Sequence, residues 1–172
     1  MSNSLIMPAL SLKSIREYAS KIRHVFGFLP DEYIDIVGIL ERLPDMGVEI
    51  EIATMKEMGD KHGETFPTVP LIKIREDVYE RACDGQARDR MTIAHEVGHL
   101  FLHGQEKISL ARLSNNTAVP AYLDPEWQAN AFAGELLAPY KYIKELSVSN
   151  IRDKYGVSIT AASIQKNRRV CS

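Results

Sequence analysis

Residues 91–103, MTIAHEVGHLFLH, decide how the rest of the chain must be arranged. Almost every side chain in this stretch is apolar, so a helix formed here is buried on most of its sides. His95, His99 and His103 stand four residues apart and form one polar stripe on the helix, with Glu96 beside it. Burying three imidazoles and a carboxylate without partners is costly. The stripe is therefore expected to face a cleft, a metal ion or both.

The segment HEVGH within this helix has the HExxH spacing of zinc peptidases. Two histidines one helical turn apart aim both imidazoles at one ion, about 2.0–2.1 Å from each nitrogen. The glutamate between them lies near the ion, where it can accept a proton from water and pass it to the leaving amine. The pattern indicates His95 and His99 as ligands and Glu96 as general base. A cluster of satisfied core histidines is the alternative interpretation.

A third ligand is expected downstream, in DPEWQANAFAGELLAP over residues 124–139, because catalytic zinc sites usually have three protein ligands and one open position. Asp124 followed by Pro125 predicts the start of a helix. Glu126 lies in its first turn, where the positive end of the helix favours an ionised carboxylate. We take Glu126 as the third ligand and Asn130, one turn later, as a side chain that orients a ligand. An ordinary first-turn glutamate is the alternative. Zn²⁺ is the expected ion, with Mn²⁺ or Fe²⁺ as alternatives.

Three further side chains near these motifs are candidates for contacting a ligand or the substrate. His103 stands one turn beyond His99, and because three successive turns diverge from a point, we expect it beside the site instead of on the ion. His103, Tyr122 and Tyr140 are also candidates, by proximity in sequence alone, for stabilising the oxyanion of a tetrahedral intermediate. Packing is the alternative for both tyrosines. The loop from Gly104 to Leu123 is expected either to border the cleft or to be a plain surface loop.

The segments before the motif helix predict helices followed by a small sheet. Apolar residues recur at helical spacing over residues 10–26, and Asp31 is expected to cap a second helix that ends at Pro44. Three short strands are expected at residues 48–52, 69–74 and 78–79, with a loop after the first. The second strand is expected to hold an extended substrate by adding a strand to the sheet. Helices, a small sheet packed against the HExxH helix and a mostly helical C-terminal half give an α+β fold.

The C-terminal part, at about residues 149–169, predicts a helical hairpin with a turn at Gly156 and a second helix capped by Ser158 or Thr160. It resembles a helix-turn-helix, and its tail carries three basic residues. This supports a second hypothesis, a DNA-binding regulator. Three basic residues make a weak phosphate footprint, however, and the net charge is −2, so direct nucleic-acid binding is not expected.

Composition and length set the wider frame. The 172 residues fit one domain, residues 1–172. Cys83 and Cys171 are far apart and in no metal-ligand spacing, so we expect no disulfide framework and a reducing compartment. The N-terminus has no basic stretch followed by an apolar one, and no apolar run approaches roughly 18 residues. A cytoplasmic protein without a membrane partner is the expectation.

The stretch TIAHEVGHLFLH, followed after a loop by EWQANAFAGELLAP, resembles the ImmA/IrrE family of bacterial and phage metallopeptidases. The resemblance, over roughly residues 30–140, implies a zincin-like fold with zinc held by His95, His99 and Glu126 and with Glu96 as base. Members typically cleave helix-turn-helix transcriptional repressors, so it also implies a repressor as substrate and relief of repression. Gln128 stands where many members have a second acidic residue. The alternative is a non-proteolytic regulator that binds a repressor, a toxin or DNA.

Overall fold

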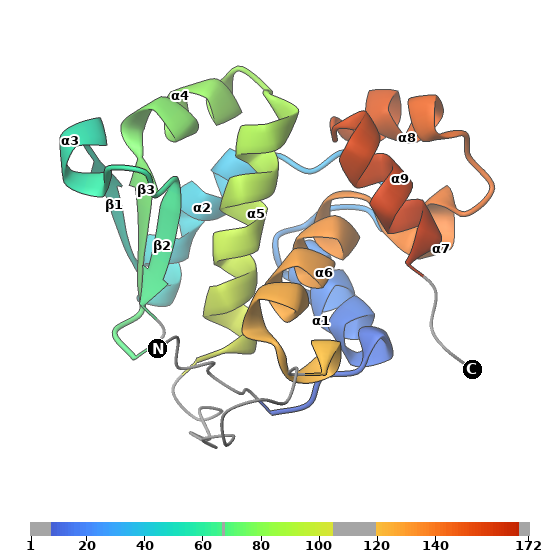
Figure 1. Ribbon diagram of the computed structural model, residues 1–172, viewed down its shortest axis with the longest axis horizontal. Coiled ribbons are helices and arrows are strands. Elements are labelled where there is room, and N and C mark those ends of the chain that lie inside the picture. The colour runs from blue at the N-terminus through green and yellow to red at the C-terminus, as the bar shows by residue number, and fades with distance from the viewer. Residues whose placement is uncertain (1–7, 67, 105–119, 169–172) are drawn as a thin grey trace.

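The computed structural model describes residues 8–66, 68–104 and 120–168, which form a mixed α+β arrangement of a small sheet and many helices (Figure 1). The α+β fold class is thereby confirmed. Residues 105–119 of the expected cleft loop, Arg169 and Cys171 lie outside the described residues. In chain order the elements are α1 (Leu12–Val25), α2 (Ile36–Arg42), η1 (Leu43–Met46), β1 (Glu49–Ala53), α3 (Met55–Met58), β2 (Gly63–Phe66), β3 (Leu71–Arg75), α4 (Glu76–Cys83), α5 (Ala87–Leu102), η3 (Ala121–Leu123), α6 (Pro125–Leu137), α7 (Tyr140–Ile143), α8 (Val148–Tyr155) and α9 (Ile159–Asn167).

The second helix begins later than the sequence indicates. Its N-cap is Asp35, whose Oδ1 accepts a hydrogen bond from the backbone N–H of Gly38 at 3.0 Å. Asp31, the expected cap, instead accepts a hydrogen bond from the Lys154 ammonium of α8 at 3.0 Å. Both aspartates suit a helix start by type, and the tertiary contact with α8 decides which one caps.

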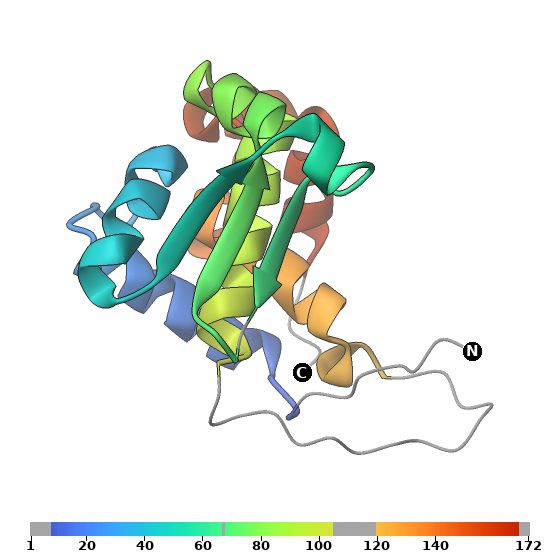
Figure 2. The same ribbon diagram turned by 90° about the vertical axis from the view of Figure 1, so that its left-hand side faces the viewer.

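The sheet has three strands in the order β1-β3-β2 (Figure 2). β1 runs parallel to β3, with Glu49 opposite Leu71, and β2 runs antiparallel to β3, with Gly63 opposite Ile74. Because β3 is paired on both sides, it offers no edge to a substrate, and the expectation of strand addition there is wrong. Within the described residues the free edge next to α5 belongs to β2, a strand that was expected to be loop.

The expected third strand at residues 78–79 is also wrong, because this segment lies in the helix α4. Glu76 and Asp77 stand in its first turn, where carboxylates favour the positive helix end. Val78 and Ala82, one turn apart, are its buried side chains. Two apolar residues in sequence are too few to tell a strand from the first turn of a helix.

The motif helix α5 lies at the centre of the structure, with the sheet on one side and α1 and α6 on the other (Figure 1). Gly98 allows the approach of α6, since a Cβ there would lie 3.1 Å from Phe132 Cδ1 and 3.2 Å from the Ala129 carbonyl oxygen. The α8–α9 hairpin has the expected turn, with Gly156 at φ +62° and Ser158 capping α9. No helix in the described ranges has the length and apolar character needed to cross a bilayer.

Candidate metal centre

Three side chains from two helices bring their donor atoms to one point. His95 and His99 lie one turn apart on α5, and their Nε2 atoms are 2.9 Å from each other. Glu126 stands in the first turn of α6, where Asp124 caps the helix by accepting the Glu126 N–H at 3.0 Å. Its two carboxylate oxygens lie 3.2 Å from the Nε2 atoms of His95 and His99. The structure thus brings together the three residues expected to be ligands.

These separations suit a metal ion with tetrahedral geometry. Nitrogen and oxygen ligands about 2.0–2.1 Å from such an ion lie roughly 3.4 Å from one another. The donor atoms here lie 2.9–3.2 Å apart, close to that value before any ion draws them into place. Two imidazoles and one carboxylate are also the donor set of hydrolytic zinc sites, which leave one position open. The residues therefore fit Zn²⁺.

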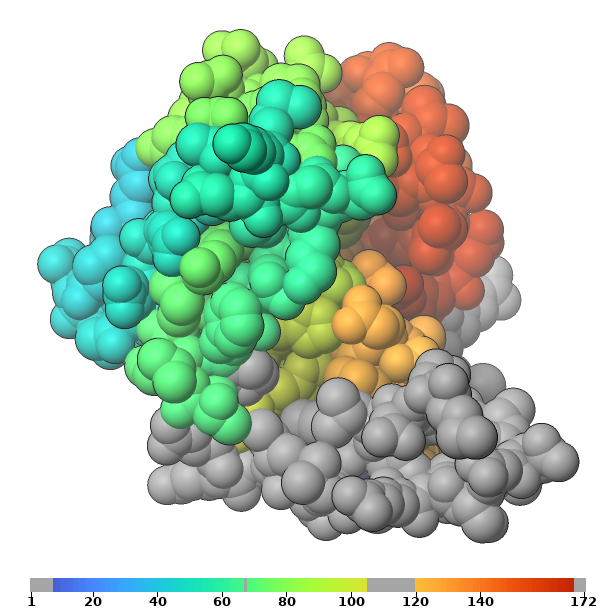
Figure 3. Space-filling view, turned by 60° about the vertical axis from the view of Figure 1, so that its left-hand side comes forward, coloured from blue at the N-terminus to red at the C-terminus, as the bar shows by residue number. Residues whose placement is uncertain are grey.

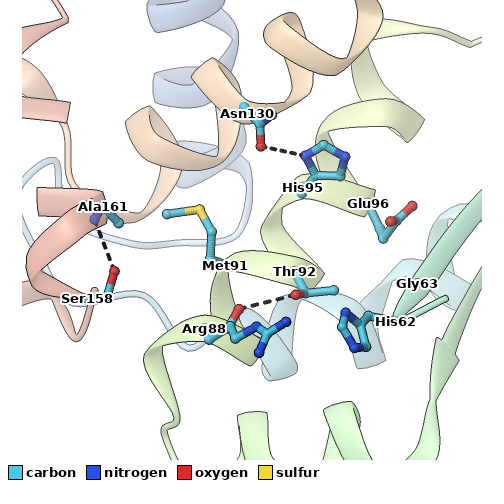
Figure 4. A pocket seen from close by; sticks show the side chains of 10 residues that line it. All are labelled: His62, Gly63, Arg88, Met91, Thr92, His95, Glu96, Asn130, Ser158 and Ala161. Carbon is cyan, nitrogen blue, oxygen red and sulfur yellow. Dashed lines mark hydrogen bonds between the residues drawn. The ribbon is translucent and has the colours of Figure 1, made fainter. Parts of the chain in front are cut away.

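Asn130 contacts the His95 imidazole on the nitrogen opposite the candidate metal site. Its Oδ1 lies 3.0 Å from Nδ1 of His95, one helical turn beyond Glu126 on α6 (Figure 4). An amide oxygen only accepts, so Nδ1 of His95 carries the proton and Nε2 keeps its lone pair. That lone pair is the one a metal ion requires.

A chain of hydrogen bonds likewise places the proton of the His99 imidazole on Nδ1. Gln128 donates from Nε2 to the carbonyl oxygens of Pro8 at 3.1 Å and Tyr122 at 2.8 Å, which uses both amide protons. Its Oε1, 2.8 Å from Nε2 of His103, must then accept. A neutral His103 accepts through Nδ1, 3.0 Å from Nδ1 of His99, so His99 donates there. Its Nε2 is left with a lone pair that faces Glu126.

The remaining expected site residues have other contacts in the described part of the chain. His103 is buried, 2% exposed, behind His99, so it contacts a candidate ligand and not the substrate side. Tyr122 is half exposed in η3 and contributes its carbonyl oxygen to Gln128. Tyr140 begins α7, with the Arg16 guanidinium 4.3 Å above its ring. Neither tyrosine is among the described residues that line the pocket beside the site.

Burial shifts the pKa values of two titratable groups at the candidate metal site. Burial, together with the imidazoles of His95 and His103, lowers the pKa of His99 to about 3. His99 is therefore neutral at neutral pH, as a ligand must be. Burial also raises the pKa of Glu96, although the Thr65 hydroxyl, which donates to Glu96 Oε2 at 2.6 Å, partly opposes this. A carboxylate with a raised pKa is a better proton acceptor.

The strand β2 positions the side chain of Glu96. The local sequence of residues 63–66 does not predict this strand. Thr65 on this strand makes the hydrogen bond to Glu96, and Gly63 lies so close that a Cβ there would be 2.7 Å from Glu96 Cγ. Only glycine permits this approach without displacing the carboxylate. With four residues and no alternation of apolar side chains, β2 lacks the period that predicts a strand.

A pocket of about 340 Å³ opens beside Glu96, between β2, α5 and α9. Figure 3 shows the surface hollowed between the β2 side of the molecule and the α8–α9 hairpin. Its lining residues, drawn in Figure 4, are His62, Gly63, Arg88, Met91, Thr92, His95, Glu96, Asn130, Ser158 and Ala161. His62, Arg88 and the α9 residues were not expected there, because only the packing of β2 and α9 around α5 brings them together.

The sequence of this chain matches the model of a known protein family. The model of the IrrE N-terminal-like domain, Peptidase_M78, matches residues 45–165. The chain belongs to this family. The resemblance to the ImmA/IrrE family is thereby confirmed, and the matched region runs from η1 to α9, farther toward the C-terminus than the motifs indicate. The helices α1 and α2 precede it, and α1 packs against α6, which carries Glu126.

The comparison with solved structures supports the fold and does not bear on the activity. A search of curated proteins gives no match. A transcriptional regulator of Mycobacterium tuberculosis is similar in structure, with a TM-score of 0.59 and 13% sequence identity. The similarity covers 92% of this chain and 48% of that chain, so this IrrE-like chain spans about half the length of the regulator.

Proposed function

We propose that this chain is a zinc-dependent endopeptidase with a zincin-like fold, and that its substrate is a helix-turn-helix transcriptional repressor. The observation that carries the proposal is the meeting of His95, His99 and Glu126 beside the buried carboxylate of Glu96. Membership of a peptidase family supports the reaction type. The substrate class follows from the resemblance to ImmA/IrrE proteins.

The mechanism assigns separate tasks to the groups around the cleft. Zinc held by the three ligands would supply a Lewis acid that polarises the scissile carbonyl and makes water more acidic. Glu96 takes the proton of the attacking water and returns it to the leaving amine. Thr65 fixes Oε2 of this carboxylate, while Oε1 accepts no hydrogen bond from the described residues and is left for proton transfer. His62 lines the same pocket.

The free edge of β2 gives a place for an extended peptide. A substrate that adds a strand there lies over α5, because β2 packs on α5 next to Glu96. Main-chain hydrogen bonds hold such a peptide with little dependence on its side chains. The pocket then contacts the side chains next to the scissile bond.

The proposal is tested by incubating the zinc-loaded protein with purified helix-turn-helix repressors from the same genome. We expect one of them to be cut at a defined bond, which mass spectrometry of the new termini identifies. Chelation with 1,10-phenanthroline should abolish the cleavage and added zinc should restore it, since the donors bind metal only as a set. Failure to cleave any repressor, or casein, with a full equivalent of zinc bound would overturn the proposal.

Replacing Asn130 with alanine should weaken zinc binding by about 10–100-fold, because His95 loses the acceptor that sets its ring and tautomer. Competition with a fluorescent zinc chelator measures this affinity. Asn150→Ala is the matched control, since Asn150 is exposed on α8 and does not line the pocket. Equal affinities for the two variants would show that Asn130 does not support the ligand.

The structure lends little support to DNA binding by the C-terminal hairpin. Lys166 donates to the Leu146 carbonyl oxygen at 2.5 Å, and Arg168 donates to Gln165 Oε1 at 3.0 Å and to the Asn130 carbonyl oxygen at 3.3 Å. Two of the three basic residues behind that hypothesis are therefore engaged with the protein. A phosphate contact would have to displace these bonds.

A further inference from the structure

One arginine beside the proposed active site has no side-chain partner among the residues that the structure describes. Of the arginines that the structure describes, Arg88 alone has a guanidinium without a hydrogen bond or ion pair to another described residue. Even Arg90, buried two residues later, donates to the carbonyl oxygens of Tyr155 at 2.9 Å and Ile34 at 2.8 Å. Arg88 is exposed, and it lines the pocket together with His62 and Glu96.

Asp89, the acidic residue next to Arg88 in sequence, pairs with another arginine. Asp89 is buried, and both of its carboxylate oxygens accept hydrogen bonds from the Arg81 guanidinium, at 3.0 and 2.9 Å. Glu96 is the only acidic residue among the described residues that line the pocket, and its Oε2 accepts a hydrogen bond from Thr65. Among the described residues that line the pocket, the positive charge of Arg88 therefore has no acidic partner.

Arg88 lies where its guanidinium can contact a peptide bound in the pocket. Arg88 precedes His95 by seven residues, two turns of α5, and therefore lies on the same side of the helix. Met91 and Ala161 add apolar surface to the lining of the pocket, and Figure 4 shows the guanidinium turned toward the side of the pocket where His62 lies. An aliphatic stem that ends in a carboxylate matches this combination of apolar wall and free cation.

The strand β2 sets the direction in which a bound substrate peptide runs. Gly63, at the start of β2, lines the pocket, whereas Phe66, at its end, does not. A peptide paired antiparallel to β2, the more stable pairing, runs from the Phe66 end toward Gly63. Its residues on the C-terminal side of the scissile bond then lie over the pocket.

We propose that Arg88 is a specificity-determining residue that binds a substrate carboxylate located on the C-terminal side of the scissile bond. The carboxylate belongs either to an acidic side chain or to the free end of the peptide. This inference rests on the proposed function in one respect: it takes the pocket beside Glu96 as the place where substrate binds. Because selection by charge needs binding and not turnover, it is testable without cleavage.

The test uses zinc-loaded protein carrying Glu96→Gln and an equimolar library of acetylated decapeptides, made once with C-terminal amides and once with free C-terminal carboxylates. Peptides retained by the protein are identified by mass spectrometry. We expect enrichment of carboxylate-bearing peptides by about fivefold, as for a charge-assisted pair at a partly exposed site. Adding Arg88→Gln should remove this enrichment, and Arg88→Glu should replace it with enrichment of lysine and arginine. Arg152→Gln on α8, an exposed arginine outside the pocket, is the matched control and should leave it unchanged.

The outcomes separate the inference from the function on which it rests. Enrichment of acidic residues among the amidated peptides assigns the carboxylate to a side chain, and enrichment confined to the free acids assigns it to the peptide end. No enrichment, or the same enrichment with Arg88→Gln, overturns the inference. Cleavage of the library by the wild-type protein without preference for a carboxylate also overturns it but leaves the peptidase intact. Enrichment that depends on Arg88 without cleavage by the wild-type protein supports the inference and counts against the peptidase.

Discussion

Replacing Glu96 with glutamine is expected to lower the rate of peptide cleavage by about 10²–10⁴-fold, the usual contribution of a positioned general base. Glutamine keeps the size of the side chain and an oxygen that accepts from Thr65, so the contact with β2 persists. It loses only the ability to take and return a proton. The bound zinc should be unchanged, because the ligand atoms come from His95, His99 and Glu126.

The measurement is kcat on the repressor identified as a substrate, or on casein, alongside metal content and thermal unfolding of the same samples. Glu145→Gln serves as the control, since Glu145 is exposed and does not line the pocket. Full cleavage by the Glu96→Gln protein would remove Glu96 from the mechanism. A variant that no longer cleaves but still relieves repression in cells would favour the non-proteolytic regulator.

Replacing Glu126 with alanine is expected to reduce the bound metal from near one equivalent of zinc to a small fraction of it. Two imidazoles alone leave the ion without the carboxylate that completes the three-ligand set. The Glu126 side chain is 65% exposed, so its loss leaves no buried cavity and the fold should be retained. A loss of metal therefore reports on ligation and not on unfolding.

Elemental analysis of the wild type, Glu126→Ala and the control Glu145→Ala, purified under matched conditions, measures this effect. Circular dichroism of the three proteins verifies that they share one fold. Zinc retained in Glu126→Ala would require another third ligand. His103 is poorly placed for that role, because its Nε2 and Nδ1 face Gln128 and His99.

Much of the helical framework could be predicted because it is specified by residues close in sequence. The motif helix follows from apolar residues and a polar stripe over residues 91–103, and α6 follows from Asp124 and Pro125, which cap and start it. The turn at Gly156 and the cap at Ser158 are equally local. In each case the deciding interactions join residues at most four positions apart.

The elements that could not be predicted depend on partners far along the chain. β2 carries no alternating pattern and forms because it pairs with β3 and packs on α5. Likewise, residues 78–79 of α4 fit a strand as well as a helix, because two apolar residues match either period. Only the paired sheet shows that β3 is paired on both sides and that β2 has a free edge among the described residues.

The candidate site divides in the same way. The sequence by itself indicated the candidate metal ligands and the candidate base, because the HExxH spacing acts within one helical turn and Glu126 stands at a recognisable helix start. Only the tertiary structure decided the state and surroundings of those residues. Gln128 reaches the Pro8 carbonyl oxygen 120 residues away, and Thr65 reaches Glu96 across 31 residues. No local pattern encodes such contacts, because they exist only once separate segments have packed together.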